Sequence, residues 1–437
     1  LYFYYNTYTE KSPILFQRIR LFQYPLFKAF LLFLICSPDL NRNPFPALVK
    51  WPWLRYNNDK YGRKIRIINH HIKVKEKLIM KRVGLLTSGG DCQALNATMR
   101  GVAKGLYNEL GGDVEIYGIE EGYKGLIYNE YRHMTGKDFA GILTKGGTIL
   151  GSSRQSFKNM RTPDENGLDK VEAMKTTYRK LDLDCLVILG GNGTQKTANL
   201  LSEEGLNILH LPKTIDNDIW GTDMTFGFQS AVDIATECID CIHTTAASHN
   251  RVFIVEVMGH KVGWLTLHAG IAGGADIVLI PEIPYDINKV CAAIEKRNRA
   301  KKGFTILAVA EGAISKEDAK LSKKEYKAKM ANYAYPSVSY ELADLIRQKT
   351  GADVRVTVPG HTQRGGSPKP YDRVLSTRLG ARAAKLIMDE DYGYMVGIVQ
   401  GETCKVPLSE VAGKLKMVDP NAGIIEEAKI VGISFGD

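Results

Sequence analysis

Short runs of apolar, mostly β-branched residues alternate with longer amphipathic stretches from about residue 80 onward. Runs of this kind are typical of buried strands, and apolar residues at helical spacing indicate helices between them. The predicted strands are Val83–Leu86, Val114–Ile119, Leu186–Leu189, Ile208–Leu211, Val252–Val257, Ile277–Ile280 and Thr305–Ala310. The predicted helices include Ala97–Leu110, Lys170–Lys180, Ser230–His243 and Ile287–Lys301. This alternation predicts an α/β fold with mainly parallel sheets covered on both faces.

The net charge of the chain is concentrated in its first part. The whole chain has a formal net charge of +10, but residues 1–79 hold 14 lysines and arginines against 4 acidic residues. Residues 80–437 hold 44 of each sign. A body with balanced charge gives no electrostatic reason to expect nucleic acid, so we predict no nucleic-acid partner.

Residues 1–79 also differ in composition, because they contain one glycine out of 42 and no methionine before Met80. We expect 1–79 to be an atypical N-terminal extension outside the native protein. The rival interpretation is a targeting segment, since the apolar run Leu26–Cys36 resembles the core of a signal peptide. That run is too short to span a bilayer. We therefore expect a cytoplasmic protein with no membrane partner.

The seven cysteines are scattered and do not suggest a disulfide framework. Cys238 and Cys241 are spaced like half of a metal or redox motif, but no second pair accompanies them. Because they lie three residues apart in a predicted helix, we expect them to be buried in its packed face. The charge run Lys316–Lys329 is expected to be a solvated helix or loop.

The segment Lys213-Thr214-Ile215-Asp216-Asn217-Asp218 directly follows a predicted strand and its proline exit. Ligands of open α/β sheets bind at such strand ends. Phosphoryl transfer requires a base for the attacking hydroxyl, a carboxylate that orders magnesium, and cations for the phosphates. Two carboxylates beside a lysine and a threonine supply these groups. The alternative is a structural turn, because Asp and Asn favour turns for local reasons.

Two glycine turns join predicted strands to helices. The first, Thr87–Asn96, contains Gly89-Gly90, and the second, Gly190–Lys196, contains Gly190-Gly191-Asn192-Gly193-Thr194. Glycine lets the backbone approach a ligand, and a helix N-terminus presents free N–H groups to an anion. Either turn alone could be structural. Because the pattern occurs twice, we expect both turns to hold one polyphosphate.

Arginine and histidine residues complete the candidate site. A third glycine turn, Gly146–Arg154, ends in an arginine that could stabilise a transferring phosphoryl group. Further along, Arg355, His361 and Arg364 lie within ten residues among glycines. Such a group of donors suits a phosphate monoester, although a single histidine is more often a core residue than a ligand.

Taken together, these motifs resemble those of the 6-phosphofructokinases. TSGGDxxxxN, GGTxLGSxR, GGxGT, PKTIDND, EVMG and GHxQRGGSPxxxDR occur here in the family's order, from about Lys81 to near the C-terminus. The resemblance implies two Rossmann-like, three-layer domains with the active site in the cleft between them. It implies a nucleotide-binding domain of residues 80–226 plus about 363–414. It also implies a sugar-phosphate-binding domain of residues 227–362 plus about 415–437.

The same resemblance implies transfer of the γ-phosphoryl of ATP to the 1-hydroxyl of fructose 6-phosphate, with Mg²⁺ as cofactor. Asp216 would be the base, Arg154 and Thr214 would contact the transferring group, and Asp218 would help to hold the metal. The implied nucleotide-binding residues are Gly90, Arg154, Gln155, Gly191, Asn192, Gly193 and Thr194. The implied sugar-phosphate-binding residues are Thr214, Asp216, Arg251, Met258, Gly259, His260, Glu311, Arg355, His361 and Arg364.

Arg251 and Arg355 would reach into the site of a neighbouring subunit, which implies a homotetramer or dimer. Asn192 replaces an aspartate that is linked to magnesium in many members, so its metal contact would be weaker or indirect. Lys213 is frequent in pyrophosphate-dependent members, whereas Gly193 matches ATP users. We favour ATP and keep pyrophosphate as the alternative donor. Kinases of NAD or lipids, a non-catalytic regulatory subunit and a membrane-anchored protein are weaker alternatives.

Overall fold

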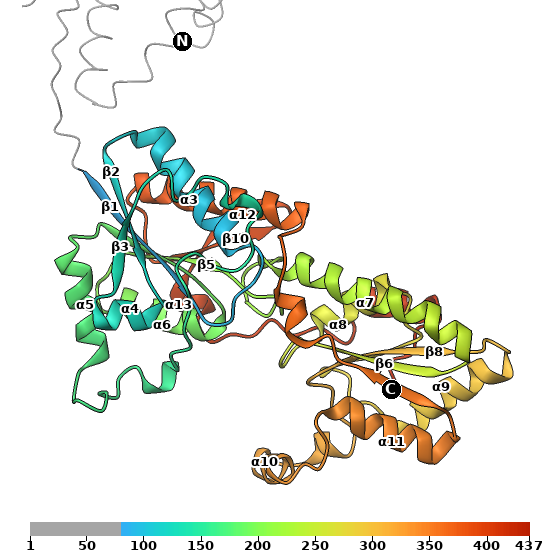
Figure 1. Ribbon diagram of the computed structural model, residues 1–437. Coiled ribbons are helices and arrows are strands. Elements are labelled where there is room, and N and C mark those ends of the chain that lie inside the picture. Colours follow the sequence, from blue (N-terminus) through green and yellow to red (C-terminus); the bar gives the residue numbers. More distant parts are fainter. Residues whose placement is uncertain (1–79) are drawn as a thin grey trace, which may run out of the picture. The chain divides into compact units, whose positions relative to one another are not determined.

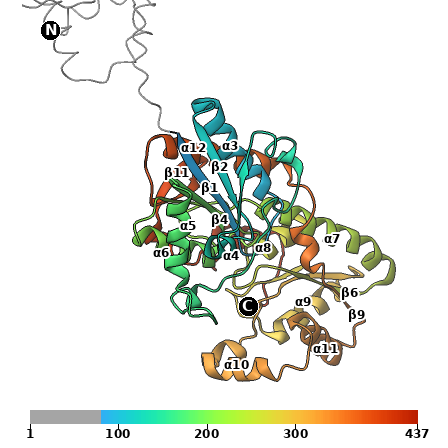
Figure 2. The same cartoon turned by 60° about the vertical axis from the view of Figure 1, so that its left-hand side comes forward.

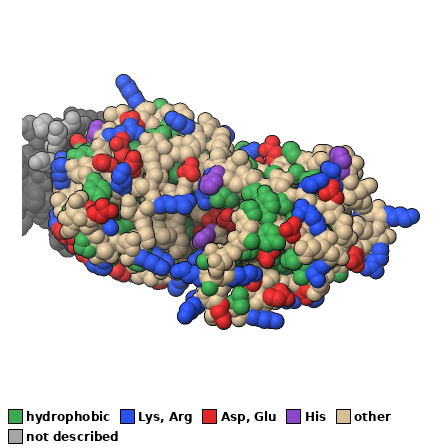
Figure 3. Space-filling model, turned by 60° about the horizontal axis from the view of Figure 1, so that its bottom comes forward, with side chains coloured by type: hydrophobic (Ala, Val, Ile, Leu, Met, Phe, Trp, Pro, Cys, Tyr) green, Lys and Arg blue, Asp and Glu red, His purple; other side chains and the backbone are tan. Residues whose placement is uncertain are grey.

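The computed structural model describes residues 80–437 of the 437-residue chain. The expectations for residues 1–79, including the apolar run Leu26–Cys36, lie outside the described residues. Within residues 80–437, no helix is both long and apolar enough to cross a membrane. On the face shown in Figure 3, acidic and basic side chains are interspersed, as expected from their equal numbers in this part of the chain.

The first of two sheets has seven strands and a mainly parallel arrangement (Figure 1). From edge to edge its strands are β11 (Glu402–Pro407), β10 (Tyr394–Val399), β5 (Ile208–Pro212), β4 (Cys185–Gly190), β1 (Lys81–Ser88), β2 (Val114–Ile119) and β3 (Tyr131–Met134). Only the outermost strands, β11 and β3, pair with their neighbours in antiparallel fashion. The central strands are therefore the parallel part that the alternating pattern predicts.

Helices cover both faces of this sheet because its strands bury side chains in both directions. In β4, Val187 and Leu189 belong to one hydrophobic cluster, whereas Leu186 and Ile188 belong to the cluster on the opposite face. The helices packed on the first cluster are α3 (Leu95–Leu110) and α12 (Pro370–Met388). Those on the second are α4 (Tyr123–Tyr128), α5 (Lys170–Lys180), α6 (Asn192–Glu203) and α13 (Leu408–Val411).

The second sheet has four parallel strands in the order β7 (Ile277–Leu279), β8 (Thr305–Ala310), β6 (Val252–Val257) and β9 (Val354–Thr357). One face is covered by α7 (Phe228–His249) and α8 (Trp264–Ala272), and the other by α9 (Ile287–Arg299) and α11 (Val338–Thr350), as Figure 2 shows. After α14 (Gly423–Ile430), Ser434 pairs with Ile277 at the sheet edge.

Both three-layer units have the α/β architecture that we predicted, and the hydrophobic cluster beneath α3 and α12 continues beneath α7 and α8. One polar contact reinforces this junction. The buried carboxylate of Asp372 in α12 accepts hydrogen bonds from the backbone N–H groups of Gly227 (3.0 Å) and Ser230 (2.8 Å). Gly227 and Ser230 lie at the start of α7, so a residue of one three-layer unit caps a helix of the other.

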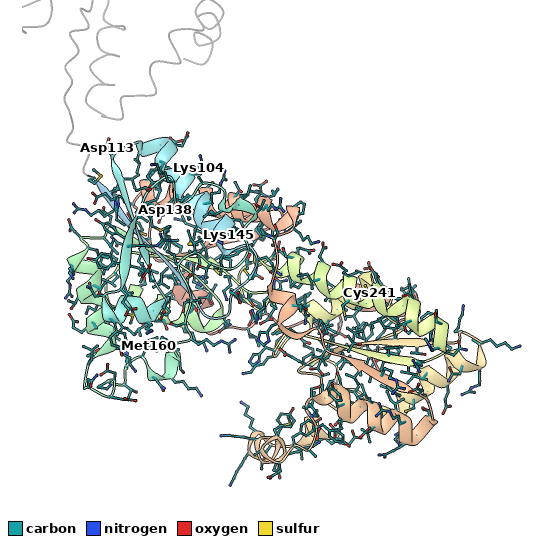
Figure 4. All side chains as sticks on the ribbon, in the orientation of Figure 1. Lys104, Asp113, Asp138, Lys145, Met160 and Cys241 are labelled. Carbon is teal, nitrogen blue, oxygen red and sulfur yellow. The ribbon has the colours of Figure 1, made fainter. Side chains whose placement is uncertain are left out.

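All seven predicted strands occur, and four of the eight ends of the predicted helices coincide with those in the structure. The largest difference is α7, which begins at Phe228 and continues to His249. The charge run contains α10 (Lys323–Ala331), in which no residue is buried, as expected for a solvated element. The predicted burial of both cysteines in α7 is wrong. Cys238 is partly buried, but Cys241 is exposed on the outer side of that helix (Figure 4).

Candidate active site

The three parallel strands at the centre of the first sheet end level with one another. Ser88 of β1 is in register with Gly190 of β4, which is in register with Pro212 of β5. The segments that follow these residues therefore leave the sheet side by side at its carboxyl edge. This register brings together the two glycine turns and the acidic segment, although the first glycine turn and the acidic segment are more than 100 residues apart in sequence.

Lys213 lies between the two glycine turns. A Cβ placed at Gly89 or at Gly191 would lie 3.8 Å from its Nζ atom. Gly89 has a φ of +86°, which few residues other than glycine adopt. The side chain of Lys213 is buried, and burial lowers the pKa of its ammonium group. A buried ammonium group between two glycine turns is suited to binding a polyphosphate.

Backbone and side-chain bonds join the third glycine turn to the first. Gly89 N–H donates to Ser153 O (3.1 Å), and Ser152 Oγ donates to Gly89 O (2.6 Å). Arg154, which follows Ser153, has an exposed side chain. Its Nη2 lies 3.6 Å from the position that a Cβ atom at Gly90 would take. Gln155 follows and is half-buried.

Arg364, which lies between β9 and α12 in the chain, reaches the same turn. Its Nη1 lies 3.1 Å from a Cβ position at Gly90 and donates to Asp91 O at 3.0 Å. Two guanidinium groups, those of Arg154 and Arg364, thus face Gly90. Gly90 has no side chain to separate them from a ligand, so both arginines can contact phosphate oxygens at this point.

The acidic segment is fixed by its own hydrogen bonds. The backbone N–H of Asp216 donates to Thr214 Oγ1 (3.0 Å), and Thr214 O accepts from Thr225 Oγ1 (2.8 Å). Asn217 adopts a left-handed conformation with φ of +53° and accepts a hydrogen bond from Thr225 N–H (3.0 Å). Thr214 is buried, whereas Asp216 remains half-buried and accessible.

Asp218 differs electrostatically from an ordinary surface carboxylate. Burial, together with the charge of Asp216, raises its pKa to about 6. Its Oδ1 atom is buried and has no hydrogen-bond partner among the described residues. An unpaired buried carboxylate oxygen is costly unless a ligand satisfies it, so Asp218 fits the role of a cation ligand.

Asn192 and Gly193 form the first turn of α6, and Thr194 follows them. The side-chain amide of Asn192 donates to Lys414 O (2.9 Å), which fixes the direction of its oxygen. The buried hydroxyl of Thr194 donates to Ser88 O (3.4 Å). Gly193 is exposed, and a Cβ placed there meets no atom within 4 Å. Residues 80–437 contain no cluster of three or more His, Cys, Asp or Glu arranged for a metal. A metal here would therefore need phosphate or water ligands.

The residues expected to hold the sugar follow β6 and β8 in the second sheet. Glu311 Oε1 accepts hydrogen bonds from the N–H groups of Gly259 (3.3 Å) and His260 (2.7 Å). His260 is exposed and has a φ of +52°. His361 is also exposed, in the short 3₁₀ helix η5 (Gly360–Arg364) that follows β9.

Gln363 connects the sugar side to the phosphate side. Its side-chain Oε1 accepts from Met258 N–H (3.2 Å), and its backbone O accepts from Gln93 Nε2 (2.9 Å). We assigned no role to Gln363 or to the capping residue Asp372 from the sequence, although both stand within the GHxQRGGSPxxxDR motif. The motif was the available signal, and only the folded contacts reveal what these residues join.

Arg251 and Arg355 lie apart from the remaining residues within this chain. Both guanidinium groups contact the carboxylate of Asp353, at 2.7 Å and 3.2 Å respectively, near the amino ends of β6 and β9. Met258 follows the carboxyl end of β6. The six residues of β6 separate it from Arg251, which corresponds to roughly 20 Å. That Arg355, His361 and Arg364 serve one phosphate stays a prediction.

Comparison with known proteins identifies a family. The phosphofructokinase family pattern matches residues 82–387. An ATP-dependent 6-phosphofructokinase of Spirochaeta thermophila is 55% identical over 361 residues, which are 81% of this chain and 97% of that protein. The ATP-dependent 6-phosphofructokinase 3 of Bacteroides thetaiotaomicron is 44% identical over 81% of this chain and its own full length.

Solved structures show the same fold. The Pichia pastoris phosphofructokinase in the T-state superposes with a TM-score of 0.67 and 31% identity, over 76% of this chain and 35% of that one. A pyrophosphate-dependent phosphofructokinase from Marinobacter aquaeolei has a TM-score of 0.65 at 21% identity, over 81% of this chain and 88% of that one, which bears on the fold alone. The chain belongs to the phosphofructokinase family.

Proposed function

We propose that this protein transfers the γ-phosphoryl group of ATP to the 1-hydroxyl of fructose 6-phosphate, giving ADP and fructose 1,6-bisphosphate. The observation that carries the proposal is the convergence of Gly90, Lys213 and Arg364 beside the Asp216 loop. This arrangement supplies cations and backbone donors for phosphates next to a carboxylate for a hydroxyl. The names of the ATP-dependent relatives support the same reaction.

In this mechanism Asp216 accepts the proton of the 1-hydroxyl as the oxygen attacks the γ-phosphorus. The bond between that phosphorus and the bridging oxygen breaks, and ADP leaves with the electron pair. Arg154 balances the charge that develops on the transferring group, and Thr214 contacts it. The N–H groups at the start of α6, with Gly191, Gly193 and Thr194, hold the remaining phosphates.

Mg²⁺ fits the residues present. Asp218 offers an unpaired carboxylate oxygen and Asn192 an amide oxygen. Magnesium is commonly held by one or two protein ligands with phosphate oxygens and waters. When bound, it would neutralise charge on the phosphates. The protein's own part is to hold these two oxygens, one in the loop after β5 and the other in the first turn of α6.

The position of Arg251 and Arg355 supports the proposal that they serve a neighbouring subunit. A strand length of roughly 20 Å separates Arg251 from Met258, which is longer than a hexose phosphate. This distance favours contact of Arg251 with the site of a neighbouring subunit. Such contacts require the expected homotetramer or dimer. We also propose that the chain divides into a nucleotide-binding domain and a sugar-binding domain.

Gly193 and Lys213 bear on the phosphoryl donor. The open space at Gly193 leaves room for the bulk of a nucleotide, which supports ATP. Lys213, which faces both glycine turns, is the observation that favours pyrophosphate as a second candidate. Purified protein should be assayed with fructose 6-phosphate and Mg²⁺, with ATP or pyrophosphate as the donor. Turnover with ATP supports the proposal, and turnover with pyrophosphate alone would replace it.

A further inference from the structure

The segment 415–418 lies between the two three-layer units and beside the acidic loop of residues 216–223. It follows α13 and leads toward α14. Leu415 forms an antiparallel bridge with Ile219, and Lys416 N–H donates to Asp218 O at 2.9 Å. The backbone of the segment thus runs directly alongside the residue expected to hold the metal.

The side chain of Lys416 closes the other end of the same loop. Its Nζ donates to Thr222 O and to Asp223 O, each at 2.9 Å. Together with the backbone bond to Asp218, one residue therefore makes three hydrogen bonds to loop 216–223. Asn217 Nδ2 also donates to Asp223 O (3.3 Å) from within the loop. The loop that carries both carboxylates is thus closed around the ammonium group of Lys416.

The second three-layer unit holds segment 415–418 from the opposite side. Trp264 Nε1 donates to Lys416 O (2.9 Å), and the ammonium group lies 5.5 Å from the centre of the Trp264 ring. Val418 N–H donates to Glu282 Oε1 (3.0 Å), which also accepts from Gly263 N–H (3.0 Å). Trp264 and Gly263 lie at the start of α8. Segment 415–418 is therefore hydrogen-bonded to the second three-layer unit, the sugar-side unit, which carries the residues expected to bind the sugar.

We infer that Lys416 is a positioning residue for phosphoryl transfer, which fixes the carboxylates of Asp216 and Asp218 relative to the sugar-side unit. This inference rests on the proposed function. The partners of Lys416 in this contact are carbonyl oxygens and an aromatic face, so the geometry depends on directed donors. Misplacement of a reacting group by about 1 Å can reduce a rate by about 100-fold. Loss of the two side-chain bonds should therefore act on catalysis more than on binding.

The test compares Lys416→Met with Lys416→Arg. Methionine keeps an apolar stem over Trp264 but removes the charge and the donors, whereas arginine keeps both. We expect Lys416→Met to lower kcat by about 10-fold or more, with KM for both substrates changed by about twofold or less. Lys416→Arg should restore most of kcat. Lys414→Met is the matched control, because this exposed side chain lies two residues earlier.

Unchanged kcat in Lys416→Met, or a loss that Lys416→Arg fails to restore, would overturn the inference and leave Lys416 a structural brace. All assays are run well below the melting temperature of each variant. If Lys416→Met does not fold, Trp264→Phe decides, since it removes the bond to Lys416 O and leaves a smaller aromatic ring near the ammonium group. We expect a smaller fall in kcat at unchanged KM, and wild-type kcat would reject the inference. Failure of the wild-type protein itself to phosphorylate fructose 6-phosphate would instead reject the proposed function.

Discussion

Replacing Gly193 with aspartate tests whether the start of α6 binds the phosphates of a nucleotide. The position accepts a side chain without strain, because a Cβ there meets no atom within 4 Å and the residue does not have a positive φ. A carboxylate in the first turn of a helix is worth about 0.3–1 kcal/mol in favour of folding. Gly193→Asp should therefore fold at least as well as the parent protein.

The effect on ATP should be large. Two unit charges about 5 Å apart interact with about 3 kcal/mol at an effective dielectric constant of about 20. Gly193 is exposed, so solvent and salt reduce the repulsion, and we expect about 1.4–3 kcal/mol. This corresponds to an increase in KM for ATP of about 10- to 150-fold. KM for fructose 6-phosphate should stay within about twofold, because that ligand does not meet this turn.

Gly193→Asn is the matched control, because asparagine has the size of aspartate without its charge. Steady-state kinetics with ATP varied at saturating sugar phosphate measures both variants. The reasoning is refuted if Gly193→Asp keeps the KM of the parent protein for ATP. It is equally refuted if the two variants raise that KM by the same factor, since size and not charge would then be responsible.

Four further outcomes can be checked on the same protein. Asp216→Ser should lower kcat by about 10²- to 10⁴-fold with sugar binding retained in calorimetry, and near-normal turnover would exclude it as the base. Arg364→Ala should raise KM for the sugar phosphate more than KM for ATP; the opposite order would contradict its assignment. Asp372→Ala should lower the free energy of unfolding in urea by about 2–4 kcal/mol, because it leaves two buried N–H groups of α7 unpaired. Burial lowers the pKa of His210 to about 3, so the unfolded chain binds the proton more readily and stability should fall by up to about 1.4 kcal/mol per unit as pH drops from about 6.5 toward 3. His210→Gln should flatten this slope, and an unchanged slope would show that other groups cause it.

Local pattern was sufficient for the seven strands and four helices that we predicted, since each has an apolar period that its neighbours do not share. It did not single out β10, although four of its residues are buried within the first sheet. The pattern was weaker at the edges of the first sheet. The outer strand β11 has no buried residue, because it pairs on one side only and its side chains meet solvent. The predicted burial of Cys241 failed for a related reason. Spacing places residues on one helix face but does not say where along that face the covering layer ends.

The candidate site divides in the same way. Gly90, Gly193 and Asp216 could be selected from the sequence as candidate site residues. Glycine turns after strands and a pair of carboxylates together indicate phosphoryl transfer, although each alone could be structural. The different contacts of Arg355, with Asp353, and of Arg364, with Asp91, could not be read from a run of ten residues. They depend on the pairing of β9, which holds Arg355, with β6, and on the position of Arg364 in the 3₁₀ helix η5 after that strand.

By itself the sequence determined the class of fold, the family and the chemical groups available for phosphoryl transfer, because these depend on residue type and short spacing. Only the tertiary structure decided that Ser88, Gly190 and Pro212 end level, that Lys213 lies between two turns, and that Lys416 closes the acidic loop. Each of these contacts joins residues distant in the chain. Strand register and helix packing fix such contacts, and neither leaves a local signal in the residues that meet.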